Sequence, residues 1–327
     1  MPSICFVACV ESGPLEAQTV RMAESLRDFG GALADAEVLG ITPRFGPPLS
    51  RQTRRRFDEL GVRHERLPSH PRYAWYHYLN TPISLAAAEE LTDADILCWA
   101  DSDLLFMGEP AELLLDDELD FIAGSTDNGV VGTTGPGAEY EGDWRRLCEL
   151  LDIDLESLPW VVTHLEQERI RLYFQAGLFA YRRGTGFSRF YLDMCTEALD
   201  RHFGFANSGE NYIDQVCLGL AVHERGLRWR QLAPSHNFPM ASFLPHADRP
   251  DELARARVLH YHDSMEPHFW ATCLERLAPA HPEVHEWLSA RGSLGNAAPK
   301  PWRLVTQGLR MARGLPRRRY RLRAQPA

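Results

Sequence analysis

Residues 96–106, Ile-Leu-Cys-Trp-Ala-Asp-Ser-Asp-Leu-Leu-Phe, carry the strongest structural signal in this sequence. Its apolar side chains run up to two aspartates, Asp101 and Asp103, and resume directly after them. Such a run predicts a buried strand of a parallel sheet, because strands that are covered on both faces are apolar throughout. Side chains two positions apart on an extended segment point to the same side. We therefore expect both carboxylates to converge on one hard cation, Mg²⁺ or Mn²⁺.

An Asp-x-Asp pair is weak evidence alone, since aspartate often begins a turn for structural reasons. Here the pair is flanked by apolar residues, where a carboxylate needs a cation or hydrogen-bond donors to be tolerated. A divalent ion at the end of a strand is a suitable clamp for a diphosphate. The stretch therefore favours an enzyme that uses a nucleotide-sugar donor.

The first hundred residues alternate between apolar runs and segments of helical spacing. Strands are predicted over 4–10, 36–41 and 62–67, and helices over 15–29, 50–60 and 81–91. This alternation predicts an α/β fold with a mixed, mostly parallel central sheet flanked by helices. Ligands of such sheets bind at the carboxyl ends of the strands, which is where Glu11 and Asp101 fall.

The composition is that of a globular protein, with 44% apolar and 24% charged residues in 327. No apolar run is long enough to span a bilayer, and the first residues do not resemble a signal peptide. The seven cysteines show no paired spacing and are typical of a reduced protein. We therefore expect a cytoplasmic protein, which could be peripheral at the inner face of the membrane.

Charge is distributed unevenly. From Lys300 onward there are nine Lys or Arg and no acid, while the whole chain has a net charge of −10. We therefore divide the chain into a catalytic domain, 1–290, and a basic tail, 291–327. The acidic body excludes nucleic acid as a partner. The tail mixes arginines with apolar residues such as Trp302 and Leu304, so it is either a helix for an anionic membrane surface or a disordered segment.

Four motifs, in this order, resemble those of the GT-A (Rossmann-like) glycosyltransferases, most closely family 8 with its glycogenin-like and lipopolysaccharide galactosyltransferase-like members. The resemblance covers roughly residues 4–272. The motifs are Asp101-Ser102-Asp103, Phe174-Gln175-Ala176-Gly177, Asp214-Gln215, and His260-Tyr261-His262 with Pro267 and Trp270 after it.

This resemblance implies a metal-dependent hexosyltransferase of the EC 2.4 class that uses a UDP-sugar with Mn²⁺ or Mg²⁺. Its acceptor would be a glycan, a lipid-linked sugar or a small molecule. Similar membrane-attached bacterial glycosyltransferases often carry a basic tail, which would suit a lipid-linked or lipopolysaccharide-like acceptor. The expected roles fall into three groups. The metal would be held by Asp101, Asp103 and His260, with His262 as a weaker candidate; the donor would contact Glu11, Asp101, Ser102 and Gly177; and the reacting carbon would lie near Asp214, Gln215 and Gln175.

The chain also departs from the family pattern. Gln175 replaces the usual Asn, and Asp263 and Glu266 stand where the family has a Gly and a Lys that help to hold the diphosphate. Two acids there would repel a diphosphate unless a metal or an arginine compensates. Two alternatives therefore remain, a nucleotidyltransferase that makes nucleotide sugars and a non-catalytic binding protein on the same fold. The turn Glu11-Ser12-Gly13-Pro14 argues against the first, because it is not a basic, glycine-rich loop.

Overall fold

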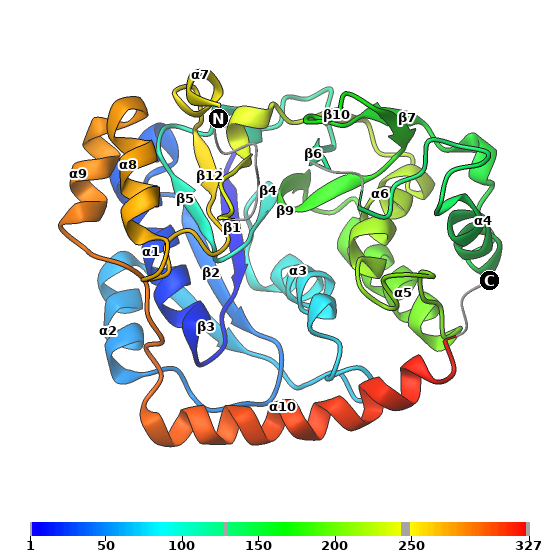
Figure 1. The fold of residues 1–327 in the computed structure, drawn as a ribbon, viewed down its shortest axis with the longest axis horizontal. Helices are drawn as coiled ribbons and strands as arrows, with labels where there is room; N and C mark the ends of the chain where they lie inside the picture. The colour runs from blue at the N-terminus through cyan, green and yellow to red at the C-terminus, as the bar shows by residue number, and fades with distance from the viewer. Residues whose placement is uncertain (1, 127–129, 243–248, 325–327) are drawn as a thin grey trace.

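The computed structural model describes residues 2–126, 130–242 and 249–324. At its centre is a seven-stranded sheet with the order β10-β6-β9-β4-β1-β2-β3 (Figure 1). Among these strands only β9 runs antiparallel to its neighbours. The strands are β1 (Ile4–Cys9), β2 (Glu37–Thr42), β3 (Val62–Arg66), β4 (Ile96–Ala100), β6 (Phe121–Ser125), β9 (Phe174–Arg182) and β10 (Trp229–Gln231).

Helices cover both faces of the sheet. Ile4, Phe6 and Ala8 of β1 belong to the core packed against α1, whereas Cys5 and Val7 face the core on the other side. This double burial explains why β1 and β4 are apolar throughout. The predicted α/β class is confirmed. The helices of the two layers are α1 (Pro14–Phe29), α2 (Arg51–Leu60), α3 (Asn80–Leu91), α4 (Glu141–Leu150), α5 (Phe187–Asp200) and α6 (Ile213–Glu224).

A smaller sheet with the order β11-β12-β5 stands beside the carboxyl ends of the central strands. Its strand β5 (Leu104–Phe106) follows β4 along the chain, and β12 (Val258–His260) pairs antiparallel with β5. Leu105, Leu259 and Met265 belong to a third hydrophobic core, which the smaller sheet shares with α8 and α9. Further elements are β11 (Phe238–Pro239), α7 (Pro250–Leu253), α8 (Trp270–Ala280), α9 (Pro282–Ser289) and a separate hairpin of β7 (Trp160–Val162) with β8 (Arg169–Arg171).

Residues 96–106 do not form one continuous strand. β4 ends at Ala100, and residues 101–103 make a turn that is closed by a hydrogen bond from the Leu104 amide to the Asp101 carbonyl at 3.2 Å. The chain then resumes as β5 in the smaller sheet. The extended geometry that would align Asp101 with Asp103 is therefore absent, because the backbone turns between them.

The basic tail is helical. Helix α10 (Lys300–Arg321) runs along the lower edge of the view in Figure 1 and ends beside α5. Tyr320 is buried, with its ring 5.0 Å from that of Trp75, and its hydroxyl donates to the carbonyl of Phe203. Arg317 and Arg321 both pair with Glu210. In the described parts of the chain, no helix is long and apolar enough to cross a membrane.

Candidate active site

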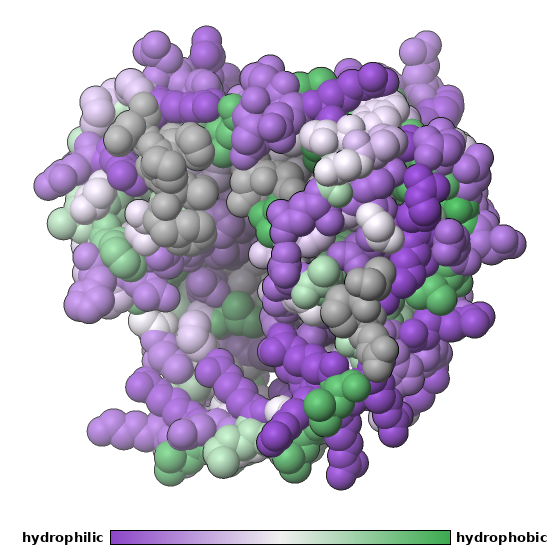
Figure 2. Space-filling model, turned by 45° about the vertical axis from the view of Figure 1, so that its right-hand side comes forward, coloured by the Kyte–Doolittle hydropathy of each residue, from purple (hydrophilic) through white to green (hydrophobic). Residues whose placement is uncertain are grey.

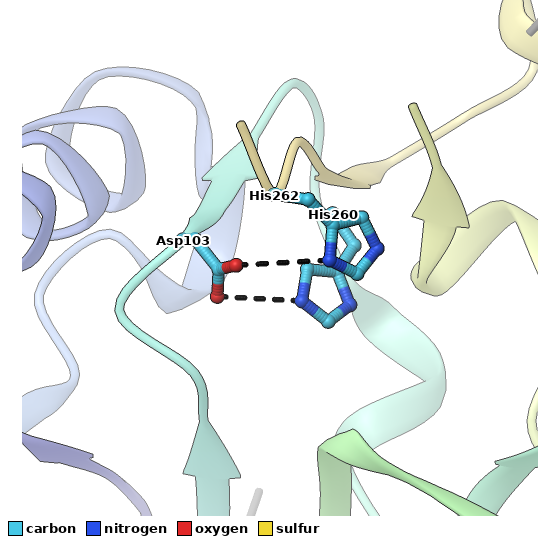
Figure 3. Close-up of side chains that lie close together, drawn as sticks. All are labelled: Asp103, His260 and His262. Atoms are coloured by element: carbon cyan, nitrogen blue, oxygen red, sulfur yellow. Dashed lines mark ion pairs between the residues drawn. The ribbon is translucent and has the colours of Figure 1, made fainter. Parts of the chain in front are cut away.

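Three side chains meet beside the carboxyl end of β4: Asp103, His260 and His262 (Figure 3). His260 Nε2 lies 3.3 Å from Asp103 Oδ1, and His262 Nδ1 lies 3.9 Å from Asp103 Oδ2. The two imidazole rings stack with centroids 3.9 Å apart. One ligand atom from each residue falls within 4.8 Å of the others, which is the spacing of a metal-binding group.

Backbone geometry brings these residues together. His260 ends β12, where it pairs with Leu104 of β5, and the amide of Tyr261 donates to the Asp103 carbonyl at 3.1 Å. His262 has a φ of 51°, in the left-handed region that few residues other than glycine adopt. This turn folds the ring of His262 back onto that of His260. Such strained backbone conformations cluster at functional sites.

The donor set fits a divalent cation. One carboxylate and two imidazoles form a mixed oxygen and nitrogen site, and imidazole ligands favour Mn²⁺ over Mg²⁺, which prefers oxygen alone. Burial would raise the pKa of Asp103, but His260 and His262 outweigh it and hold the pKa below its ordinary value. Burial, with His260, lowers the pKa of His262 to about 4. Asp103 is therefore ionised and His262 neutral at pH 7, the forms that bind metal.

Asp101 stands beside this group rather than in it. Its Oδ1 accepts a hydrogen bond from Trp99 Nε1 at 2.8 Å, and its amide donates to the carbonyl of Gly177 at 2.8 Å. Burial, with the nearby charge of Asp103, raises the pKa of Asp101 to about 7. The turn at 101–103 directs the two carboxylates to different partners. The sequence predicted Asp101 as the third member of the group, with Asp103 and His260. In the structure His262 has that place.

Gln175 and Gly177 lie against the metal group. Gln175 Nε2 is 3.4 Å from His260 Nδ1, while Gln175 Oε1 accepts from the Gly177 amide at 2.6 Å and from the side chain of Asn237. Gly177 has no side chain to obstruct the imidazole of His260. Both residues therefore position His260. The sequence had predicted only that Gly177 contacts the donor and that Gln175 lies near the reacting carbon.

Asp214 and Gln215 occupy the first turn of α6. Asp214 is buried and accepts a hydrogen bond from the Tyr76 hydroxyl at 3.1 Å. Burial raises the pKa of Asp214 to about 7, although Tyr76 and the α6 backbone oppose the shift. Gln215 is partly exposed on the same turn. A carboxyl that titrates near neutral pH at the start of a helix is a candidate acid or base.

Two further predicted contacts have different surroundings. Ser102 is buried, and its hydroxyl donates to Gln18 of α1 at 3.4 Å, so its side chain faces away from Asp103 toward α1. Glu11 follows β1 and forms a two-pronged ion pair with Arg44, at 2.7 Å from Nε and 2.6 Å from Nη2. The sequence analysis missed Arg44. Its position just after β2, at the same edge of the sheet, was the available signal.

The structure also gives partners to Asp263 and Glu266, the two acids that differ from the family pattern. Asp263 accepts hydrogen bonds from both the amide and the hydroxyl of Ser242, so its carboxylate stabilises a loop. Glu266 is exposed, and its amide closes a turn onto the Asp263 carbonyl at 2.9 Å. Asp263 is thus already engaged by protein donors, which weakens the expected repulsion of a diphosphate.

The sequence comparison gives the class of protein. The family profile of the Rhodobacterales glycosyltransferase domain matches residues 6–226, and the chain belongs to this family of glycosyltransferases. The matched region contains the turn at 101–103, the Gln175–Gly177 segment and Asp214, and it ends before His260. No protein with curated annotation matches the sequence.

Several solved structures are similar in fold. The bifunctional glycosyltransferase WbbM has 13% identity and a TM-score of 0.47 over 88% of this chain, which spans about half, 51%, of WbbM. Mouse xyloside xylosyltransferase 1 has 10% identity and a TM-score of 0.44, over 79% of this chain and 96% of that one. The glycosyltransferase GlyE of Streptococcus pneumoniae TIGR4 has 13% identity and a TM-score of 0.49, over 91% and 67%.

Proposed function

We propose that this glycosyltransferase is a metal-dependent hexosyltransferase that uses a nucleotide-sugar donor, with a UDP-sugar as the first choice. The observation that carries the proposal is the group of Asp103, His260 and His262 at the carboxyl ends of the parallel strands. Ligands of open α/β sheets bind at this edge. The resemblance to family 8 supports UDP and a GT-A catalytic domain over 1–290.

Each side chain then has a defined task. Asp103, His260 and His262 would hold Mn²⁺, or less favourably Mg²⁺. A divalent ion held there supplies charge neutralisation for the nucleoside diphosphate that leaves. Gln175 and Gly177 fix the ring of His260, and Asp101 contributes a second, half-buried carboxyl next to the group.

Asp214 and Gln215 of α6 and Gln175 of β9 are proposed to lie nearest the anomeric carbon. The pKa of about 7 for Asp214, raised by burial, gives it a mixture of protonated and ionised forms at neutral pH. It could therefore exchange a proton with a hydroxyl group or stabilise positive charge at the sugar. The resemblance to family 8 favours retention of configuration.

The acceptor is proposed to be a glycan, with a lipid-linked sugar as the first candidate. Helix α10 exposes an apolar stripe of Leu304, Met311, Leu315 and Leu322, flanked by Arg318 and Arg319. Hydrophobic side chains line the lower edge of the molecule in Figure 2. A helix with these two properties binds anionic bilayers peripherally. We therefore propose that the tail, 291–327, places the protein on the cytoplasmic face of the membrane.

The first experiment measures thermal stabilisation by UDP, GDP, ADP, CMP and dTDP, with and without Mn²⁺, for the wild type and for Asp103→Asn. The proposal expects an Mn²⁺-dependent increase in Tm with one nucleotide, which Asp103→Asn abolishes. The matching nucleotide sugars are then assayed for hydrolysis or transfer. If no nucleotide binds, the donor assignment is wrong. Binding without turnover would support the non-catalytic alternative.

A further inference from the structure

Helix α10 closes a cavity of about 520 Å³ against the carboxyl ends of β1 and β2. Its floor includes Glu11 and Arg44, and α10 supplies Arg310, Arg313 and Arg317 to its wall. This volume lies within the range of about 300–1,000 Å³ that is usual for pockets that bind small molecules. The cavity joins the tail to the part of the sheet where nucleotides bind in open α/β folds.

The cavity carries an excess of positive charge. Four arginines line it; Arg44 pairs with Glu11 and Arg317 pairs with Glu210, so the excess charge is that of Arg310 and Arg313. The guanidinium of Arg310 has no hydrogen bond or ion pair with any described residue, and that of Arg313 donates only to the carbonyl of Phe45. Burial and the nearby Arg44 lower the pKa of Arg313. An anion between these arginines would relieve their mutual repulsion.

A polar group on α10 also lacks a partner. The hydroxyl of Thr306 lines the cavity and is buried without a hydrogen bond to any described residue. Buried polar atoms in native proteins are nearly always paired, so an unpaired one points to an absent ligand or water. Thr306, Arg310, Arg313 and Arg317 lie on one face of α10, because their spacing follows the helical repeat.

The cavity and the metal group both follow the carboxyl ends of neighbouring strands. β1 and β4 are neighbouring parallel strands with Val7 opposite Trp99, so Glu11 and Asp103 follow adjacent strand ends, and such strands are about 4.8 Å apart. The hydroxyl of Tyr78 senses charges of both regions. Burial is the main cause that raises its pKa, Asp214 and Asp101 beside the metal group raise it further, and Arg317 of the cavity lowers it. A diphosphate that reaches the metal group could therefore also reach the arginines of α10.

We propose that α10 forms the cationic wall of the donor site and that Arg310 and Arg313 bind the phosphates of a nucleoside diphosphate. This inference rests on the proposed function and deepens it. It assigns to the C-terminal helix the positive charge that is missing where Asp263 and Glu266 stand. The tail is then part of the active site as well as a membrane contact, because its arginine face and its apolar stripe lie on different sides of one helix.

The test is calorimetric titration of the full chain with UDP and with UMP, in Mn²⁺, for the wild type, Arg310→Gln, Arg313→Gln and the control Arg318→Gln. Arg318 is on the exposed side of the same helix. Each cavity variant is expected to lose about tenfold or more in UDP affinity, the usual effect of removing a charge-assisted hydrogen bond. UMP should lose less, and the control should bind UDP as the wild type does.

The possible results separate the two proposals. Unchanged UDP affinity in both cavity variants would overturn the role of α10 and leave the proposed function intact. Equal losses for UDP and UMP would overturn the assignment of these arginines to the diphosphate. Failure of the wild type to bind UDP, GDP, ADP or dTDP would overturn both proposals. Circular dichroism and Tm of each variant check that the fold is intact, which is expected for Arg310→Gln because Arg310 is an exposed residue.

Discussion

A Cβ atom on Gly177 would lie 2.6 Å from Cε1 of His260 and 2.9 Å from its Nδ1. Such distances are too short for real contacts, so the ring of His260 occupies space that only glycine leaves open. Gly177 is in β9 of the central sheet, whereas His260 ends β12 of the smaller sheet. The close approach of these two residues joins the sheets and fixes one proposed metal ligand.

Gly177→Ala should therefore displace His260 and weaken Mn²⁺ binding by about 10- to 100-fold, the usual cost of losing a residue that supports a ligand. Calorimetric titration with Mn²⁺ measures the change. Gly124→Ala is the matched control, because Gly124 is also in a strand of the central sheet and an added Cβ would contact nothing within 4 Å. Equal Mn²⁺ affinity in both variants would contradict the positioning role of Gly177.

His262→Gln tests the residue that the sequence analysis gave as the weaker candidate for a metal ligand. We expect this variant to lose at least about tenfold in Mn²⁺ affinity, because Nδ1 of His262 faces Asp103. His268→Gln, which alters an exposed histidine outside the group, should retain the affinity of the wild type. Asp101→Asn should cost less than Asp103→Asn. The reverse order would restore Asp101 as the main ligand.

Asp214 should make stability depend on pH. Its pKa of about 7 in the folded protein exceeds the ordinary 3.8, so the folded state binds more protons than the unfolded state between pH 4 and 7. This contribution is complete below pH 4 and is lost as pH rises to 7. The loss is at most about 4 kcal/mol of the free energy of unfolding.

Urea denaturation of the metal-free protein at several pH values checks this effect. Asp214→Asn should become more stable relative to the wild type as pH rises from 4 to 7. Asp117→Asn, a change at an exposed residue, should keep the pH profile of the wild type. Parallel profiles for Asp214→Asn and the wild type would show that Asp214 has the same pKa in both states.

Tyr320 should determine whether α10 stays docked. Removal of a large buried aromatic side chain usually costs about 3–5 kcal/mol, and here it also removes the hydrogen bond to Phe203. Tyr320→Ala should therefore speed cleavage by trypsin at the arginines of α10. Leu322→Ala, at a residue that is 75% exposed, should not. Equal cleavage rates would mean that the helix is held by other contacts, such as the Glu210 pairs.

The order of strands and helices could be predicted because apolar periodicity follows directly from burial. β1 and β4 are apolar on both faces, and Gly61 ends α2 with a φ of 64°, as a glycine C-cap does. The turn at 101–103 could not be predicted in this way. The apolar residues on either side of this turn are equally compatible with one long strand and with two strands in different sheets.

Two of the three residues of the candidate metal group were singled out by the sequence. Asp103 and His260 were assigned together from the motif order, and the structure brings them to 3.3 Å. His262 was only a weaker candidate, because side-chain alternation applies within a strand and β12 ends at His260. His262 itself has a left-handed backbone, which the sequence does not indicate. The helical tail and its contact with the sheet edge depend on pairs distant in sequence, such as Arg313 with Phe45 and Arg317 with Glu210. Periodicity carries no information about such pairs.

The meeting of Asp103 with His260 has a consequence for folding. All seven cysteines are free, so within the described residues no disulfide closes a loop. An ion shared by these two residues would cross-link positions far apart in the chain, and it would bind only when β5 and β12 are paired. At a concentration one hundred times its Kd, it would add about 2.7 kcal/mol to the free energy of unfolding. A chelator would then act on this protein as a reducing agent acts on a disulfide-bonded one.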